Sequence, residues 1–249
     1  MQQKYYDIMY EDSAIVVVNK ASGISMEGGG WDDSKLRVDK QVPYPIYPID
    51  QEASGLVVFA KDAIAHKLLS AYVDKQEVEQ RYTVAVYGRP SWKENTCSLP
   101  LVPNGDKRHR AILDSYRGRK SITRFAVLGY AGNFCLLEAR PITNSPHQIR
   151  AHLAALGHPV VCDSLYGRAP ARGGAPGILL SSFKKNWRGD PHEEKPLINR
   201  LALHAAAIRL PSLKGMPPQL FQAPFPRDFT ALITQMAKQG TFFENPLEG

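Results

Sequence analysis

Residues 141–167 read PITNSPHQIRAHLAALGHPVVCDSLYG, and this segment limits the possible folds more than any other. Ser145 can cap a helix, and Pro146 suits the first helical position. Gly157 suits a left-handed exit, so a helix is predicted over residues 146–156. Its buried stripe would consist of Ile149, Leu153 and Leu156. The segment therefore predicts one short helix, around which the rest of the fold is assigned.

Strand-like segments lie on both sides of this helix. The runs AIVVVNK and GLVVFA predict buried strands over residues 14–20 and 55–60. Further strands are expected over 82–87 and 201–210, and a hairpin from 122–128 and 134–139. Asp62 is placed to cap a helix that ends near Lys75, and a last helix is expected over 229–238. Many strands with few helices indicate the α+β class, with a mixed, mostly antiparallel sheet.

The composition is that of a folded protein with a substantial core. The chain has 249 residues, of which 43% are hydrophobic and 22% charged, so one large domain over 1–249 is expected. Turn-rich loops are expected at 28–30 and 167–177. The three cysteines are far apart, and the N-terminus lacks the apolar core of a signal peptide. We expect a protein of the reducing cytoplasm that does not enter a membrane.

The charge balance favours an anionic partner. Lys and Arg number 31 against 24 Asp and Glu, which gives a net charge of +7 and a pI near 9.3. Such an excess attracts polyanions such as nucleic acids, although many basic proteins bind none. Residues 106–124 contain seven basic residues against Asp106 and Asp114. This basic segment is either a phosphate-binding surface or an ordinary solvated one.

Two candidates for chemistry emerge from local patterns. Asp50 lies in a turn directly before a buried strand, where its backbone would be held in place. The alternative is that Asp50 is a turn-forming or capping residue. His147 and Arg150 are three residues apart and share one helical face, from which Arg150 could reach a carboxylate. The alternative is that Arg150 is a solvent-facing charge.

Several other classes of site are excluded by spacing. His147 and His152 are five residues apart, about 140° around a helix, so they do not form the helical zinc-binding pair. The Gly-x-Ser-x-Gly elbow of hydrolases is absent around Ser54, and no phosphate-binding loop of the Walker type occurs. His204 is interpreted as a structural histidine on a strand. The sequence therefore predicts neither a metal site nor a cofactor.

The chain resembles the RluA-type RNA pseudouridine synthases over residues 8–235, nearly its whole length. The resemblance is carried by the ordered segments YPIDQEASGLVVFAKD, QRYTVAVYG, GRKSITRF, PITNSPHQIRAHLAALGHPVVCDSLYG and LALHAAAIRL. It implies the pseudouridine synthase fold, with a central RNA-binding cleft and Asp50 as the nucleophile. Tyr82 matches the tyrosine that packs against the target base, and Arg150 the arginine that pairs with the aspartate. Nothing resembles the S4 domain of some relatives, so we expect a monomeric catalytic domain.

These roles fit the chemistry of the reaction that the resemblance implies. A uracil in structured RNA must be flipped out before its glycosidic bond can be reached. Tyr82 would stack on that base, and Arg150 would favour the ionised form of Asp50. Asp50 would then attack either the ribose C1′ or the uracil ring. The reaction needs no cofactor, and RNA is the expected partner.

The sequence departs from the family pattern at three basic positions. Tyr47-Pro48-Ile49-Asp50 replaces His-Arg-Leu-Asp, Thr143-Asn144-Ser145-Pro146 replaces Thr-Gly-Arg-Thr, and Gln80 replaces a common lysine. Because Asp50, Tyr82 and Arg150 are all retained, we interpret the losses as altered RNA recognition. The leading hypothesis is an active enzyme on ribosomal or transfer RNA. The alternative is a catalytically silent RNA-binding protein of the same fold.

Overall fold

The computed structural model describes residues 5–25, 44–167, 177–184, 186–190, 193–212 and 217–243. The loop expected at 28–30 and most of the one expected over 167–177 lie outside these residues. The chain divides into two compact units, the first comprising 1–82 and 204–224 and the second 83–203 and 225–249. Each unit is described by itself, and the single domain expected over 1–249 stays a prediction.

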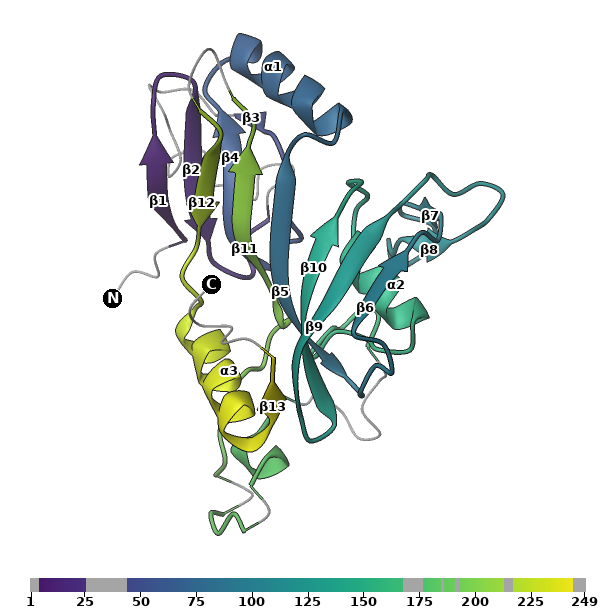
Figure 1. Ribbon diagram of the computed structural model, residues 1–249, viewed down its shortest axis with the longest axis vertical. Coiled ribbons are helices and arrows are strands. Elements are labelled where there is room, and N and C mark those ends of the chain that lie inside the picture. Colours follow the sequence, from purple (N-terminus) through teal and green to yellow (C-terminus); the bar gives the residue numbers. More distant parts are fainter. Residues whose placement is uncertain are drawn as a thin grey trace. The chain divides into compact units, whose positions relative to one another are not determined.

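The first unit is a sheet with one helix (Figure 1). Its strands follow the order β1-β2-β4-β11, in which β4 and β11 are parallel and the other neighbours antiparallel. Two short strands extend the sheet, as β3 pairs with β4 and β12 with β11. The bounds are β1 Tyr6–Glu11, β2 Ile15–Lys20, β3 Tyr44–Pro45, β4 Ser54–Ala60, β11 Leu203–Leu210, β12 Gln219–Gln222 and the helix α1 Ala63–Asp74.

The central strands of this unit form as their sequences predict. Val16, Val17 and Val18 of β2 are fully buried, which explains why this strand is a continuous β-branched run rather than an alternating one. In β4, a Cβ atom at Gly55 would lie 2.3 Å from the carbonyl oxygen of Ala205, so only glycine lets the two backbones approach this closely. The predicted strands over 14–20 and 55–60 are confirmed, with small shifts at their ends.

The second unit is built on a hairpin of two long strands. Its sheet follows the order β5-β10-β9-β13, and β6 pairs with β9. The chain passes into this unit within β5, between Tyr82 and Thr83. The bounds are β5 Glu79–Tyr87, β6 Glu94–Cys97, β7 Leu101–Val102, β8 Ile112–Leu113, β9 Thr123–Ala131, β10 Phe134–Pro141, β13 Thr241–Phe242, α2 Gln148–Ala155, α3 Arg227–Gln239 and the 3-10 helix Leu180–Ser182. The small β7–β8 ladder forms a separate two-stranded sheet.

The helix α1 begins and ends where the sequence predicts. The Asp62 side chain accepts a hydrogen bond of 2.7 Å from the backbone N–H of Ala65, and the helix ends at Asp74. The C-terminal helix α3 covers the predicted range, and the predicted hairpin over 122–139 is present as β9 and β10. The α+β class with a mixed, mostly antiparallel sheet is therefore confirmed.

The start of α2 was predicted wrongly. The helix begins at Gln148, and the residue before it, His147, has a φ of 56° and makes no capping hydrogen bond through its side chain. Ser145 lies three residues before the helix and does not cap it, and its hydroxyl lies 3.0 Å from that of Ser121. The end is as predicted, since Gly157 has a φ of +84°. Ile149 and Leu153 are buried, whereas Leu156 is only partly buried.

Within the described residues, none of the helices combines the length and the apolar character that crossing a membrane requires.

Candidate active site

Asp50 lies on a loop that leads directly into β4. Its side chain is partly exposed, while the neighbouring Ile49 is buried and anchors the chain before it. The backbone N–H of Ala53 donates to the Asp50 carbonyl over 3.1 Å, which closes a tight turn over 50–53. Asp50 is thus presented at the surface by a turn whose two ends are fixed.

A buried lysine holds this loop against a second one. Lys20, at the end of β2, is 1% exposed, and its ammonium donates to four backbone carbonyl oxygens. Two of these belong to the Asp50 loop, those of Gln51 at 3.0 Å and Ala53 at 2.8 Å. The other two belong to the loop after β2, those of Ala21 at 2.9 Å and Ile24 at 3.0 Å. Lys20 therefore ties together two loops about thirty residues apart.

Backbone contacts reinforce this tie. The N–H of Gly23 donates to the Gln51 carbonyl over 2.8 Å, and the Gln51 side chain donates back to the Gly23 carbonyl over 3.2 Å. Gly23 has a φ of +87°, a conformation that glycine adopts without strain. The Ser22 hydroxyl donates to the Glu52 carbonyl. The Asp50 loop is therefore held at Gln51, Glu52 and Ala53.

The first residue of β4 is held from the other side. Ser54 and His204 are both fully buried, and the Ser54 hydroxyl lies 2.9 Å from Nδ1 of His204. They are paired residues in the parallel ladder of β4 and β11. The interpretation of His204 as a structural histidine on a strand is thus confirmed, and its contact fixes the strand that follows the Asp50 loop.

Tyr82 lies close enough to Asp50 for the two to interact electrostatically. Tyr82 is 5% exposed, and its pKa is raised well above the usual value by burial first, and then by Tyr47 and by the charge of Asp50. Its hydroxyl donates to Oε1 of Gln80 over 2.8 Å. The residue that replaces the family's lysine is therefore buried and serves as a neutral hydrogen-bond acceptor for Tyr82. Tyr82 remains a protonated phenol throughout the ordinary pH range.

Arg150 is a fully buried charge of the second unit. Its side chain is 1% exposed and forms a two-point ion pair with Asp163, with Nε–Oδ2 and Nη2–Oδ1 distances of 2.8 Å each. Burial would raise the pKa of Asp163, but Arg150 and the backbone N–H groups of Tyr166 and Leu165 outweigh this and lower it. The alternative that Arg150 faces solvent is therefore wrong. The ion pair fixes the plane of its guanidinium.

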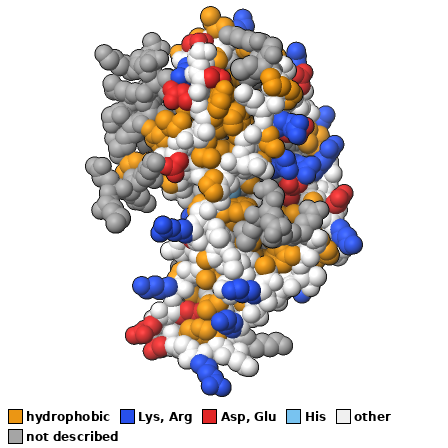
Figure 2. Space-filling view, turned by 60° about the vertical axis from the view of Figure 1, so that its left-hand side comes forward, with side chains coloured by type: hydrophobic (Ala, Val, Ile, Leu, Met, Phe, Trp, Pro, Cys, Tyr) orange, Lys and Arg blue, Asp and Glu red, His pale blue; other side chains and the backbone are white. Residues whose placement is uncertain are grey.

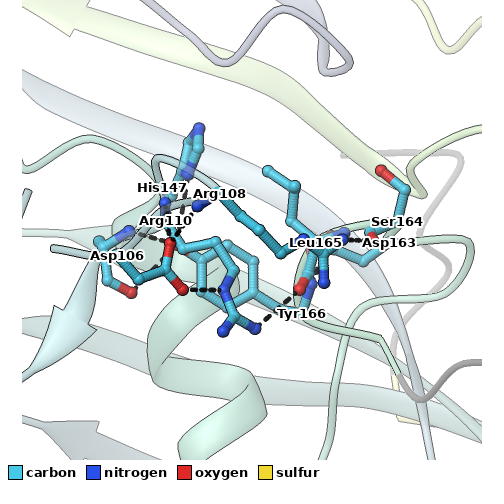
Figure 3. Close-up of polar contacts among 9 residues, drawn as sticks. Asp106, Arg108, Arg110, His147, Asp163, Ser164, Leu165 and Tyr166 are labelled. Atoms are coloured by element: carbon cyan, nitrogen blue, oxygen red, sulfur yellow. Dashed lines mark hydrogen bonds and ion pairs between the residues drawn. The ribbon is translucent and has the colours of Figure 1, made fainter. Parts of the chain in front are cut away.

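Tyr166 links Arg150 to the loop between β7 and β8. The Arg150 guanidinium lies 5.4 Å from the centre of the Tyr166 ring, and that of Arg110 lies 5.9 Å from it. The Tyr166 hydroxyl accepts from the N–H of Ala111 over 2.7 Å. It also lies 3.2 Å from Nδ1 of His147 (Figure 3). These contacts join the start of α2, the segment after it and the basic β7–β8 loop.

The β7–β8 loop is further tied to the segment after α2. The Asp106 carboxylate accepts from the backbone N–H groups of Arg108 and Arg110 and pairs with Nε of Arg110 at 2.6 Å. Arg108 donates to the Ser164 carbonyl over 2.8 Å, and Arg110 to the Leu165 carbonyl over 3.2 Å (Figure 3). The arginines of this loop therefore have structural partners as well as a positive charge.

Polar side chains of α2 are also buried and bonded. Nε2 of Gln148 donates to the Ile122 carbonyl and the Thr123 hydroxyl over 2.9 Å each. His152 lies between Thr123, 3.0 Å from Nδ1, and the Leu99 carbonyl, 2.9 Å from Nε2. Burial lowers the pKa of His152, while the hydrogen bond to Leu99 opposes this effect. His152 is therefore a neutral structural residue at neutral pH.

The structure places the three predicted site residues in two groups. Asp50 and Tyr82 lie together in the first unit, whereas Arg150 lies in the second, so the predicted pairing of Arg150 with Asp50 stays a prediction. Sequence reasoning missed the roles of Lys20, Gln80 and Asp163. A lysine ending a buried β-branched run was the available signal for Lys20, because such a charge must find partners.

Comparison with known proteins identifies the family. A model of the RNA pseudouridylate synthase family matches residues 14–155. The dual-specificity RNA pseudouridine synthase RluA of Escherichia coli (strain K12) is 32% identical over 186 residues, which cover 72% of this chain and 85% of the relative. The ribosomal large subunit pseudouridine synthase C of Haemophilus ducreyi is 28% identical over 92% of this chain and 68% of the relative.

Solved structures show the same fold at lower sequence identity. The human RNA pseudouridylate synthase domain containing 4 superimposes with a TM-score of 0.71 at 18% identity, covering 92% of each chain. Human RNA pseudouridylate synthase domain containing 1 gives a TM-score of 0.63 at 22% identity, covering 90% of this chain and 86% of the other. With a family match over more than half of the chain and an RluA relative above 30% identity, this chain belongs to the RluA-type RNA pseudouridylate synthases, a family of isomerases.

Proposed function

We propose that this chain isomerises uridine to pseudouridine in a structured RNA, with Asp50 as its nucleophile. In this reaction the bond between uracil N1 and ribose C1′ breaks, and a bond between uracil C5 and C1′ forms. The proton on C5 is lost, and N1 gains one, so that the product is an isomer of the substrate. The observation that carries the proposal is the presentation of a partly exposed carboxylate on a firmly held loop, beside a buried tyrosine.

The geometry of the Asp50 loop suits a nucleophile. A nucleophilic carboxylate must be placed accurately, because small displacements from the reactive geometry reduce the rate strongly. Lys20 and Ser54 fix the loop at its C-terminal end, while Asp50 itself is only partly buried.

Tyr82 and Arg150 complete the proposed site. The Tyr82 ring would stack on the flipped uracil, and its hydroxyl, held by Gln80, would stay protonated beside the Asp50 carboxylate. We propose that Arg150 orients Asp50 and favours its ionised form. The family resemblance supplies this last role. Within its own unit, the ion pair with Asp163 fixes the plane of the guanidinium.

The substrate is proposed to be ribosomal or transfer RNA. Two relatives are named for dual specificity and for the ribosomal large subunit, respectively. A net charge of +7 favours binding to a polyanion, and Figure 2 shows Lys and Arg side chains more widespread than Asp and Glu on one face. Exposed Pro48 and buried Gln80 replace basic residues of the family pattern, so the RNA must be gripped partly by other residues.

A tritium-release assay tests the proposal. RNA labelled with tritium at uracil C5 releases the label when pseudouridine forms. We expect release from total cellular RNA with the parent protein and none with Asp50→Asn, which removes the nucleophile and keeps the size of the side chain. Glu52→Gln, in the same loop, is the matched control and should retain activity. RNA binding without tritium release by the parent would favour the silent RNA-binding alternative.

A further inference from the structure

An aromatic side chain projects from the second unit and is almost fully exposed among the described residues. Tyr116 follows β8 in the turn over 114–118, and it is 99% exposed. Single exposed apolar residues are common and need no special explanation. Tyr116 differs in that its ring is almost as exposed as in an extended chain, although the turn that carries it is tightly built.

The carboxylate of Asp114 holds the turn. Its Oδ1 accepts hydrogen bonds of 2.9 Å from the backbone N–H groups of both Tyr116 and Arg117, and its Oδ2 pairs with Nε of Arg117 at 2.7 Å. The N–H of Gly118 donates to the Asp114 carbonyl over 2.9 Å. A Cβ at Gly118 would lie 2.3 Å from that carbonyl oxygen and 2.7 Å from atoms of Pro100. The backbone under Tyr116 is therefore fixed.

The turn is also anchored to the buried part of its unit. The N–H of Asp114 donates to the Pro100 carbonyl over 3.1 Å, and Leu101 and Arg119 exchange backbone hydrogen bonds of 3.0 and 2.8 Å. Leu101 is fully buried and packs with Ala111, Ala151 and Tyr166 in a small core cluster. The ring of Tyr116 is thus displayed by a rigid support, so a ligand would lose little conformational entropy in ordering it.

The residues that follow Tyr116 are positively charged. Arg117, Arg119 and Lys120 are exposed, and Asp114, the acidic residue of the turn, is already paired with Arg117. Neither Arg119 nor Lys120 has an ion-pair partner in the described part of the chain. From Tyr116 to Lys120 the chain can span at most about 14 Å, so the ring and these charges can meet neighbouring nucleotides of one strand.

We infer that Tyr116 is a stacking site for an unpaired nucleotide of the RNA substrate, with Arg119 and Lys120 contacting the adjacent phosphates. An exposed aromatic ring next to cationic side chains is an arrangement that binds single-stranded nucleic acid. Every base offers a π-face for stacking, and every phosphodiester carries a negative charge. A duplex would not stack on the Tyr116 ring, because the bases of a duplex are already stacked on each other. The identity of the ligand as RNA rests on the proposed function.

Binding measurements on the full-length chain test this inference. Fluorescence anisotropy would follow three labelled probes, which are a single-stranded oligoribonucleotide, a hairpin with an unpaired loop and a continuous duplex. All variants would carry Asp50→Asn to prevent turnover. Tyr116→Ala should weaken binding of the single strand and hairpin by about five-fold to 150-fold, the range for one stacked base. Tyr116→Phe keeps the ring and should bind like the parent.

Two further variants separate stacking from charge. Arg119→Gln with Lys120→Gln should lower the slope of log affinity against log salt by about 0.7 for each lost phosphate contact, whereas Tyr116→Ala should leave the slope unchanged. Ile64→Ala, another strongly exposed apolar residue at 75% exposure, is the control and should bind normally.

The inference would be overturned if Tyr116→Ala bound the single strand as tightly as the parent does. It would also be overturned if Tyr116→Ala lost as much affinity for the duplex as for the single strand, or if Tyr116→Phe lost as much affinity as Tyr116→Ala. These results do not depend on catalysis. Tritium release by the chain with Asp50 intact is measured separately, so failure of the stacking site and failure of the proposed function give different results.

Discussion

Arg150 and Asp163 form a two-point ion pair in which both side chains are almost completely withdrawn from solvent, at 1% and 0% exposure. Such a pair costs desolvation free energy when it forms, and each partner becomes strongly unfavourable if the other is removed. A single substitution at either residue is therefore expected to lower the stability of the protein strongly.

We predict that Asp163→Asn lowers the free energy of unfolding by about 3–5 kcal/mol, because it removes the carboxylate charge that forms a two-point ion pair with the buried Arg150 guanidinium. Urea unfolding measures the change. Glu138→Gln is the control, since it breaks the ion pair of Glu138 with the half-exposed Arg140 and should cost less than about 1 kcal/mol. If Asp163→Asn and Glu138→Gln lowered the free energy of unfolding by the same amount, burial would not be what makes the Arg150–Asp163 pair sensitive to substitution.

Lys20→Met should reduce both stability and turnover. The substitution removes the ammonium donor from four carbonyl oxygens, of which that of Gln51 keeps the N–H of Gly23, and hydrogen bonds to a charged group contribute about 1.5–3 kcal/mol each. We expect a loss of at least about 3 kcal/mol, and a fall in kcat with little change in KM, because the loop that carries Asp50 loosens. The control is Lys61→Met, which removes a partly exposed pair with Glu11. A normal kcat in folded Lys20→Met would refute the positioning role.

Tyr82→Phe should retain more activity than Tyr82→Leu, because phenylalanine keeps the aromatic ring that we propose to stack on the uracil. The missing hydroxyl leaves Oε1 of buried Gln80 without its donor, at a cost of about 1–3 kcal/mol in stability. Adding Gln80→Leu should restore part of that loss, since the unsatisfied amide is then removed as well. Tritium release and thermal unfolding on the single and double variants check both statements. Additive stability losses would argue against the Gln80–Tyr82 contact.

Stability should fall in mild acid because of His152. Burial lowers the pKa of the folded His152 below the value of about 6.5 for an unfolded histidine. As the pH falls below about 6.5, the unfolded chain binds a proton that folded His152 does not, so the free energy of unfolding decreases. His152→Gln should flatten this dependence between pH 7 and pH 5. An unaltered pH dependence in that variant would show that other groups cause it. Asp163, whose pKa is lowered in the folded protein, causes a separate loss of stability as the pH falls below about 4.

The sequence predicted the elements whose signals are local. The β-branched run of β2 and the Asp62 cap of α1 involve neighbouring residues only, and both were located correctly. The start of α2 was misplaced: His147 adopts a left-handed conformation directly before the helix, and the hydroxyl of Ser145 contacts Ser121, which lies 24 residues earlier in the chain. A contact of this kind leaves no trace in the helix pattern itself.

Only part of the candidate site was predicted from the sequence, because several of its contacts join residues that are far apart in the chain. Asp50, Tyr82 and Arg150 were found through resemblance, since spacing alone left Asp50 as a possible turn residue. The burial of Arg150 could not be deduced, because an arginine on a short helix is usually solvated and Asp163 lies 13 residues further on. The partners of Lys20 come from two loops that only the pairing of β2 with β4 brings together.

That dependence of the Lys20 contacts on strand pairing has a consequence for how the enzyme matures. The Asp50 loop cannot reach its final form in a nascent chain until β2 and β4 are joined and a lysine ammonium has been dehydrated among four carbonyl oxygens. The proposed nucleophile is thus positioned by the same event that completes the centre of the first sheet. Partly folded molecules would be chemically inert toward RNA, and enzymatic activity would report on the completion of folding.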